Sequence, residues 1–311
     1  MTQTTTSAAR RIRGRAAALV VAGTALALLA PASVTATATA ATTDSARAAT
    51  AADPVSVLKF TAKERKEALA YWTPARIKAV GKSVDLGPTG PRTKTWRGTP
   101  LSTVGRLFFI TAKGPSWCSA TAVKSANKSA VMTAAHCVRL GSAPDMTNID
   151  MVFVPGYHKG KQPHGAFAVR AVATPRSWQK ESVNDMAALT VDTDKKGRKL
   201  TDVVGGQSIA FNRAVGGTIH SFGYPATSPQ LGEELLYVSG KAKKENGRQF
   251  IPSDMTGGSS GGPWLADFNT TSGKGTLVSV NSSLDSFTPT KMYGEVFGAT
   301  AKKVYDRAQK A

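Results

Sequence analysis

From Leu101 onward the chain alternates between short apolar runs and clusters of turn-forming residues, and this pattern limits its possible folds more than any other feature. Short runs separated by turns at such spacing are typical of an all-β sandwich or barrel. The last residues, 299–310, change to a helical period and predict a closing helix. Eleven runs are expected to be strands: residues 105–111, 119–124, 130–135, 150–156, 167–175, 186–192, 208–212, 218–225, 234–240, 276–282 and 292–298.

The first 41 residues have the layout of a secretion signal. A basic stretch at residues 10–15 precedes an apolar run at 16–30 and a tail of small residues. A membrane anchor is the alternative, but this run is shorter than the roughly 20 apolar residues that a spanning helix needs. We therefore expect cleavage near residues 38–41 and export of the protein, with no stable membrane association afterwards.

Residues 42–99 differ in composition from the strand-rich part. They begin with a low-complexity stretch, followed by patterns for two short helices. Thr61 with Glu64 three residues later forms a capping-box pattern, and Thr73 followed by Pro74 is a second helix start. This segment is expected to be a propeptide or N-terminal extension. A permanent part of the mature protein is the alternative.

Composition describes a globular protein and narrows its partners. The chain is 41% hydrophobic and 19% charged, which is typical of a chain that buries a core. Its net charge of +20 makes nucleic acid a partner to consider, because a basic surface attracts phosphates. No recognised nucleic-acid module or aromatic–basic platform accompanies that charge, so we expect no nucleic-acid partner. The two cysteines, Cys118 and Cys137, are compatible with one disulfide, and they are too few for a Cys-rich zinc site.

Three motifs contain the residue types of nucleophilic catalysis. His136 lies in "TAAHC", Asp185 in "NDMAAL" and Ser260 in "GGSSGGP". Serine becomes a nucleophile when a base takes its proton, and the base works best when a carboxylate orients it. "GSSGG" also matches the serine elbow of α/β-hydrolases, but there the histidine follows the serine, and no histidine follows Ser260. The order His–Asp–Ser excludes that fold and matches the two-barrel serine proteases.

Other aspartates and histidines are weaker candidates. Asp150 opens an earlier strand, while Asp192 and Asp194 belong to a polar turn. The remaining histidines are expected to be surface residues in a Lys- and Gly-rich loop, or a packed strand residue: His158, His164 and His220.

Together the three motifs resemble the trypsin/chymotrypsin family, in a bacterial secreted branch similar to the V8-like glutamyl endopeptidases. The stretch "FVPGYHKGKQPHG" resembles a segment of that branch, and the resemblance spans about residues 101–300. It implies an all-β fold of two perpendicular six-stranded antiparallel barrels, about residues 100–198 and 199–298, with the active site between them. It also implies that Cys118 and Cys137 form a bridge that holds the histidine loop.

The resemblance assigns a role to each residue of the motifs. Ser260 would be the nucleophile, His136 the general base and then acid, and Asp185 the carboxylate that holds the imidazole tautomer. The glycines would let the backbone turn tightly, so that the N–H groups of Gly258 and Ser260 form an oxyanion hole. Ser259 stands where trypsin-like enzymes carry an aspartate that pairs with a new N-terminal amine. We expect that activation switch to be missing here.

Two interpretations of the specificity pocket stay open. Asp254 lies six residues before Ser260, where an acidic pocket floor would select Arg or Lys before the cleaved bond. Alternatively, it is a loop residue that accepts hydrogen bonds from neighbouring backbone. By offset, Ser279, Val280 and Asn281 should line the pocket and pair with the substrate backbone. In the V8-like branch, cleavage after glutamate depends on a histidine in the strand after the nucleophile. The stretch "TLVSVNSSL" contains no histidine, so the resemblance implies that cleavage after glutamate is disfavoured.

The sequence thus predicts a secreted serine endopeptidase that acts on polypeptide substrates as a monomer. No metal or other cofactor is expected. The alternative is a catalytically inactive protease fold that serves as a basic binding protein. The complete set of His136, Asp185, Ser260 and the glycines favours the enzyme.

Overall fold

The computed structural model describes residues 54–81, 84–139, 147–285 and 290–311. The chain divides into two compact units, Met1–Thr50 and Ala51–Ala311. The first unit, with the expected signal sequence, lies outside the described residues. Within the described part, no helix combines the length and the apolar character required to cross a membrane.

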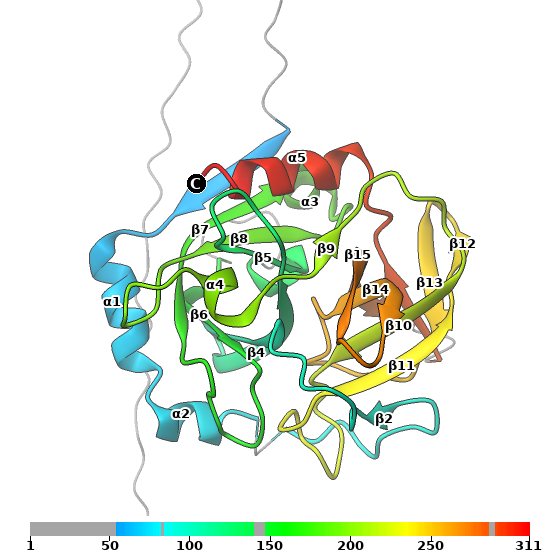
Figure 1. Cartoon of the computed structure of the whole chain (residues 1–311), viewed down its shortest axis with the longest axis horizontal. Helices are drawn as coiled ribbons and strands as arrows, with labels where there is room; N and C mark the ends of the chain where they lie inside the picture. Colours follow the sequence, from blue (N-terminus) through cyan, green and yellow to red (C-terminus); the bar gives the residue numbers. More distant parts are fainter. Residues whose placement is uncertain (1–53, 82–83, 140–146, 286–289) are drawn as a thin grey trace, which may run out of the picture. The chain divides into compact units, whose positions relative to one another are not determined.

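The first sheet of the second unit closes into a barrel of six antiparallel strands (Figure 1). Pairing between its first and last strands completes the closure. A short additional strand, β1 (Val55–Lys59), pairs with the outer side of the barrel along five residues. The barrel strands in spatial order are β7 (Phe167–Pro175), β6 (Ile149–Pro155), β3 (Val104–Thr111), β4 (Gly114–Ala122), β5 (Ala130–Thr133) and β8 (Ala187–Val191).

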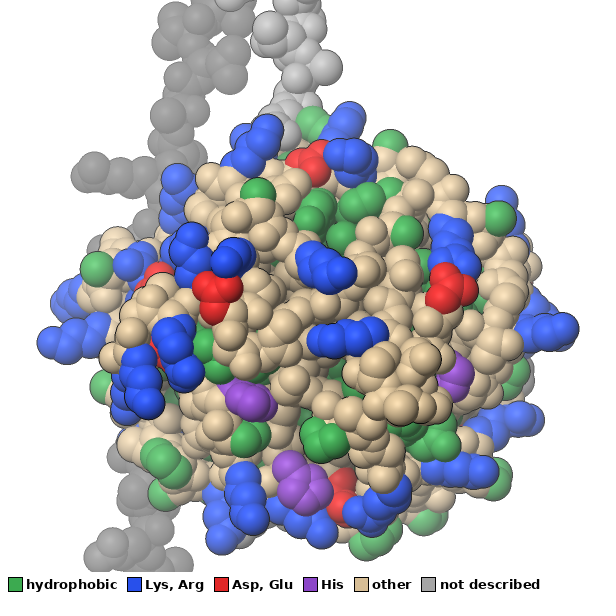
Figure 2. All heavy atoms as spheres, in the orientation of Figure 1, with side chains coloured by type: hydrophobic (Ala, Val, Ile, Leu, Met, Phe, Trp, Pro, Cys, Tyr) green, Lys and Arg blue, Asp and Glu red, His purple; other side chains and the backbone are tan. Residues whose placement is uncertain are grey.

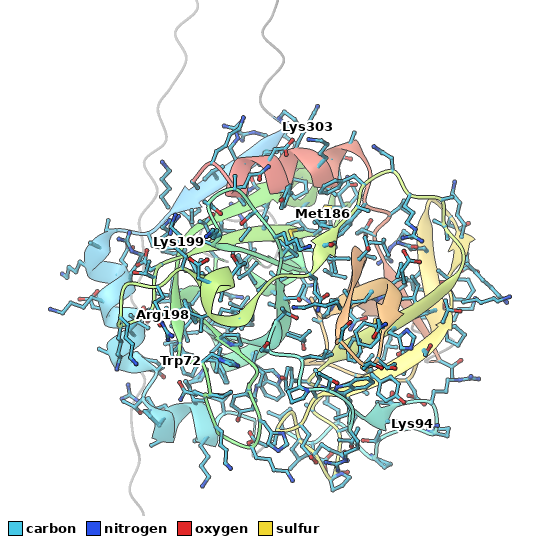
Figure 3. All side chains as sticks on the ribbon, in the orientation of Figure 1. Trp72, Lys94, Met186, Arg198, Lys199 and Lys303 are labelled. Carbon is cyan, nitrogen blue, oxygen red and sulfur yellow. A yellow bond between two sulfur atoms is a disulfide. The ribbon has the colours of Figure 1, made fainter. Side chains whose placement is uncertain are left out.

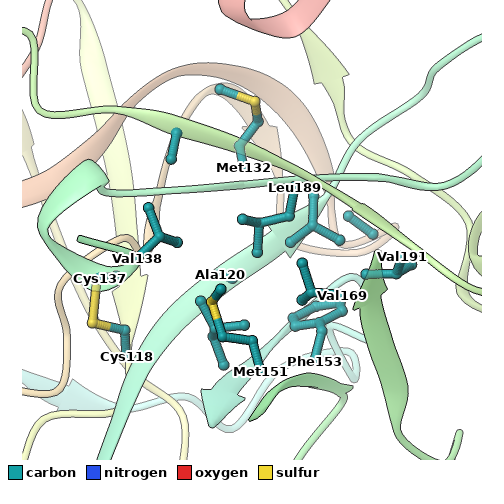
Figure 4. Packing of buried hydrophobic residues seen from close by; sticks show 14 of the residues in the cluster. Cys118, Ala120, Met132, Cys137, Val138, Met151, Phe153, Val169, Leu189 and Val191 are labelled. Carbon is teal, nitrogen blue, oxygen red and sulfur yellow. A yellow bond between two sulfur atoms is a disulfide. The ribbon is translucent and has the colours of Figure 1, made fainter. Parts of the chain in front are cut away.

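Apolar side chains fill this barrel (Figure 4). Met151 and Phe153 of β6 point inward from alternate positions of one strand, next to Val169 and Leu189 of neighbouring strands. The exposed fraction of each is 2% or less. Because successive side chains of a strand point to opposite faces, Met151 and Phe153 share the inner face of β6.

The second sheet follows along the chain and has a separate small core around the buried Trp264. Three short strands extend it: β2 (Lys94–Thr95) on β11, β12 (Lys243–Glu245) on β13 and β9 (Ser208–Ile209) on β15. Its main strands in spatial order are β13 (Arg248–Pro252), β16 (Lys291–Gly294), β15 (Lys274–Leu284), β14 (Pro263–Asn269), β10 (Thr218–Gly223) and β11 (Leu236–Lys241).

The segment before the first barrel packs against it. Helix α1 (Ala62–Tyr71) begins at Thr61, whose capping box with Glu64 is formed as the sequence predicts. Helix α2 (Pro74–Ala79) starts at the predicted Pro74. Trp72, labelled in Figure 3, lies between the two helices, is 3% exposed and packs against Phe108 of the barrel.

The predicted closing helix is confirmed as α5 (Ala299–Ala308), which lies along β7, β8 and β1 (Figure 1). Two short helices, α3 (Arg176–Glu181) and α4 (Leu200–Val204), interrupt the strands. All eleven predicted runs overlap strands, whereas β1, β2, β12, β13 and β14 were not predicted. Lys and Arg side chains are spread over the face seen in Figure 2, with few acidic side chains among them.

Candidate active site

His136 and Asp185 are in direct contact at the rim of the first barrel. His136 lies in the single 3₁₀ turn Ala135–Cys137 that follows β5, and Asp185 lies two residues before β8. Because β5 and β8 are neighbours in the barrel, their ends bring the two residues together. His136 Nδ1 is 2.8 Å from Asp185 Oδ2, and the backbone N–H of His136 donates to Oδ1 at 2.9 Å.

Asp185 is buried but ionised. Burial, with 5% of the residue exposed, would raise the pKa of its carboxyl group. The charge of His136 and hydrogen bonds from His136 and Ser282 outweigh that effect and hold the pKa of Asp185 below its ordinary value. An ionised carboxylate only accepts hydrogen bonds, so His136 Nδ1 carries a proton in this contact. When the imidazole is neutral, Nε2 has a lone pair for proton transfer.

Ser260 lies in a tight turn of the second sheet, before β14, and this turn contacts the first barrel. Its carbonyl oxygen accepts a hydrogen bond from the N–H of Ser119 in β4 at 2.8 Å. The next residue, Gly261, has φ +76°, and a Cβ atom there would lie 2.0 Å from Thr133 Oγ1 and 2.8 Å from the nitrogen of Ala134. Only glycine fits this position. The structure therefore holds the Ser260 turn against the residues that lead directly to His136.

The backbone beside Ser260 presents unused N–H groups. Within the described part of the chain, the N–H groups of Gly258 and Ser260 donate to no hydrogen bond, whereas those of Ser259, Gly261 and Gly262 do. Gly258 has φ +90°, and its carbonyl accepts from Ser119 Oγ at 2.9 Å. Two free donors on one turn are suited to bind a developing negative charge on oxygen.

The expected disulfide joins Cys118 of β4 to Cys137, directly after His136 (Figure 4). It ties the histidine turn to the strand that also contacts Ser260. Among the described residues, the one group of side chains close enough to hold a metal is Cys118, His136 and Cys137. Both sulfurs belong to the disulfide, so these residues do not fit a metal while it is intact.

The proposed pocket residues are occupied by contacts within the protein. Ser279, Val280 and Asn281 are 0% exposed. The amide of Asn281 bonds Ser221 and Trp264, and its backbone pairs with Gly261 and Gly262. No donor or acceptor of Asn281 is thus left for a substrate strand.

Asp254 also bonds within the protein. Its Oδ2 accepts the N–H of Arg92 at 2.9 Å, and its Oδ1 accepts the hydroxyl of Thr93. His220, in β10, is packed against Phe268 with ring centroids 5.0 Å apart, and burial lowers its pKa.

Sequence reasoning did not identify three residues beside the His–Asp pair. Ser282 donates from Oγ to Asp185 Oδ2 at 2.7 Å. Arg248 donates to Ser282, and Glu295 lies next to Arg248. Ser282 is the residue directly after the predicted pocket stretch, but the adjacent serines in "VNSSL" gave no sign of which one faces Asp185. Arg248 lies in β13, which was not predicted as a strand.

Comparison with solved structures identifies the family. The protease Anisep from Arthrobacter nicotinovorans is 35% identical, with a TM-score of 0.65, and the match covers 70% of this chain and 100% of that one. The chain belongs to the chymotrypsin-like serine protease family. The thermostable serine protease AL20 from an extremophilic microorganism is 36% identical over 68% of this chain and 98% of that chain, with a TM-score of 0.63.

A more distant family member supports the fold. A Glu endopeptidase is 18% identical, with a TM-score of 0.57, and the match covers 73% of this chain and all of that one. Comparisons with protein-family models and with curated proteins gave no match. The closed barrel, second sheet and C-terminal helix are those of the chymotrypsin-like double barrel, as the sequence predicts.

Proposed function

We propose that the chain is a secreted serine endopeptidase that hydrolyses peptide bonds through an acyl-enzyme on Ser260. The observation that carries the proposal is the contact between His136 and the ionised Asp185, beside a turn with free N–H groups. Its relatives Anisep and AL20 are described as a protease and a serine protease, which supports the same reaction class.

In the proposed mechanism, His136 Nε2 takes the proton of Ser260 Oγ as that oxygen attacks the substrate carbonyl. Asp185 holds the protonated Nδ1 and stabilises the imidazolium that forms. The N–H groups of Gly258 and Ser260 bind the oxyanion, and His136 then gives its proton to the leaving amine. Water then attacks the carbonyl of the acyl-enzyme while His136 takes its proton. The bond to Ser260 Oγ breaks, and His136 returns the proton to that oxygen.

We propose that residues 1–41 are a removed signal, residues 42–99 a propeptide or N-terminal extension, and residues 100–311 the protease domain. The disulfide supports an oxidising compartment such as the extracellular space. Ser259 carries no charge, and its hydroxyl bonds the carbonyl of Thr256 at 2.6 Å. Activation of a zymogen would therefore proceed without an ion pair at this position.

We propose that Asp254 acts mainly through its loop. Its two bonds to residues 92 and 93 support that role, and a basic substrate side chain would have to compete with them. The alternative, an acidic floor that selects Arg or Lys, predicts faster cleavage after basic residues. Peptide profiling of the Asp254→Asn variant separates the two.

The test of the proposed function is labelling with a fluorophosphonate, followed by intact-mass measurement. We expect one adduct on Ser260, no adduct on Ser260→Ala, and a fall in peptide hydrolysis of several orders of magnitude for that variant. A correctly folded protein that stays unlabelled would instead indicate the inactive basic binding protein. The mass of the unlabelled protein also locates the mature N-terminus.

A further inference from the structure

A partly buried ion pair, Arg248 with Glu295, lies next to the His136–Asp185 contact; the side chain of Arg248 is 34% exposed and that of Glu295 is 12% exposed. Arg248 Nη2 donates to Ser282 Oγ at 2.9 Å and to Ser283 Oγ at 3.2 Å. Its Nε is 3.3 Å from Glu295 Oε1. Since Ser282 Oγ in turn donates to Asp185, one guanidinium group is joined through a single hydroxyl to the carboxylate that orients His136.

Glu295 contacts Asp185 directly and not through Ser282. Its carboxylate accepts a hydrogen bond from the backbone of Asp185, and the residue is 9% exposed. Burial and the nearby charge of Asp185 raise the pKa of Glu295, while Arg248 opposes that rise. The charges of Asp185 and Glu295 disfavour ionisation of each other, and the charge of Arg248 opposes that effect at Glu295.

The pair also shares a groove with the imidazole. A cavity of about 860 Å³ is lined by His136, Asp185, Arg248, Glu295 and Ser282. The lining also includes Trp178 of α3 and Ser182, neither of which carries a charge. Solvent in this groove screens the imidazole only in part, so charges along the wall act on its protonation.

We propose that Arg248 and Glu295 are positioning residues that hold Ser282 and Asp185 in place and balance each other's charge at His136. This proposal rests on the proposed function, because the balance matters when His136 exchanges protons. Neither residue touches the reacting atoms. Arg248 orients Ser282 toward Asp185, and Glu295 fixes the backbone of Asp185 and neutralises Arg248.

Opposite changes follow from removing either charge. Arg248→Met leaves the charge of Glu295 uncompensated, which stabilises the imidazolium and raises the pKa of His136. Glu295→Gln leaves Arg248 uncompensated, which lowers that pKa. A unit charge in a partly solvated groove shifts the pKa of a neighbouring group by about half a unit. In the double variant Arg248→Met/Glu295→Gln the two effects cancel.

Other charged groups near the pair remain constant in this comparison. Asp185 faces it from the end before β8. On the second sheet, Glu245 of β12 pairs with Lys291 of β16 at 3.1 Å. The ring of Tyr293, whose hydroxyl bonds Glu245 and Asp285, lies 4.9 Å from the guanidinium of Arg248.

The experiment measures the pKa of His136 twice: by NMR titration and from the acid limb of kcat/KM. We expect the acid limb to move about half a pH unit upward in Arg248→Met and downward by a similar amount in Glu295→Gln. The double variant should return close to the wild type. A structural defect alone would lower activity without moving the two variants in opposite directions.

Arg213→Met is the matched control, because Arg213 forms an ion pair with Asp267 elsewhere on the second sheet. It should leave the pKa of His136 unchanged. The proposal would be overturned if the pKa of His136 shifted in the same direction in Arg248→Met and Glu295→Gln, or by no more than in this control. If the wild type hydrolyses no peptide and takes no fluorophosphonate, the proposed function fails, while the NMR titration still decides the charge balance. If Arg248→Met does not fold, Glu295→Gln alone must show the downward shift.

Discussion

The hydroxyl of Ser119 shows how single residues hold the candidate site. It accepts the N–H of Tyr224 at 2.9 Å and donates to the carbonyl of Gly258 at 2.9 Å. The N–H of the same residue bonds the carbonyl of Ser260. Through its hydroxyl and its backbone N–H, this one residue of β4 thus contacts both Gly258 and Ser260 in the turn that presents the proposed nucleophile.

Gly258→Ala should abolish most activity. A Cβ atom at this position would lie 2.6 Å from the carbonyl of Tyr224 and 2.8 Å from Trp117 Nε1, in a backbone conformation with φ +90°. The turn must move, and the N–H proposed as an oxyanion donor moves with it. We expect kcat to fall by about 10²–10³, as for loss of one oxyanion-hole donor. Burst kinetics with an activated ester measure this; unchanged turnover would contradict the assignment of Gly258.

Asp185 should make stability depend on pH in the acidic range. Its pKa is lower in the folded chain than the ordinary value of 3.8. The stabilisation is therefore present above that value and is lost as the pH falls through the folded pKa. The free energy of unfolding of the wild type should exceed that of Asp185→Asn at neutral pH, and the difference should shrink below about pH 4. Urea unfolding at several pH values measures it. A difference that does not vary with pH would be evidence against an ionised Asp185.

At the scale of elements, the first barrel depends on the segment that precedes it. Strand β1 extends the sheet beside β7, and Trp72 donates its indole N–H to the carbonyl of Asp150 at 2.5 Å. Ile77 of α2 is 0% exposed. These contacts add apolar surface to the core of the barrel.

Trp72→Ala should lower the free energy of unfolding by about 3–5 kcal/mol, as for other buried tryptophans cut to alanine. Leu69→Ala in helix α1, three residues before Trp72, is the control, since Leu69 is 36% exposed. Its effect should stay within about 0.5 kcal/mol. Equal effects of the two variants would show that α1 does not pack as described. Urea unfolding followed by fluorescence of the remaining tryptophans gives both values.

The sequence predicted elements with a strong local pattern and missed those that depend on tertiary contacts. Helix α1 was found because Thr61 and Glu64 cap it locally. Strands β13 and β14 have no clear alternation of apolar and polar residues in the sequence. Pro252 ends the first and Pro263 begins the second, next to the motif that contains Ser260. The order of the motifs along the chain predicted the contact between His136 and Asp185. The hydrogen bond from Ser282 to Asp185 could not be predicted, because it depends on where β15 meets the first barrel.

At the scale of the whole molecule, Arg106 joins three parts of the chain. Its guanidinium is fully buried among the rings of Phe108, Trp117 and Tyr157, at 4.3–4.7 Å from their centroids. It also pairs with Glu233 at 3.2 Å, and it donates to the carbonyl of Val80 at 3.4 Å. Burial lowers the pKa of Arg106, and Tyr157 and Glu233 oppose that change.

A chain that starts at residue 100 should therefore be less stable than one that starts at residue 54. It loses Trp72, Ile77 and the Val80 carbonyl that Arg106 contacts, so the buried cation keeps fewer partners. We expect a lower urea midpoint for the shorter chain at equal disulfide content. An equal midpoint would indicate that the segment is dispensable once the barrels have formed, as for a removed propeptide.

The position of the turn at Ser260 depends on both sheets. Three contacts between the two sheets hold it in place. The carbonyl of Ser260 accepts the N–H of Ser119, Gly261 packs against Thr133, and Ser282 donates to Asp185. A chain in which one half is still unfolded has the histidine without a placed serine, or the reverse. If the proposed peptidase activity is right, each copy therefore gains it only after its second sheet has docked on the first barrel.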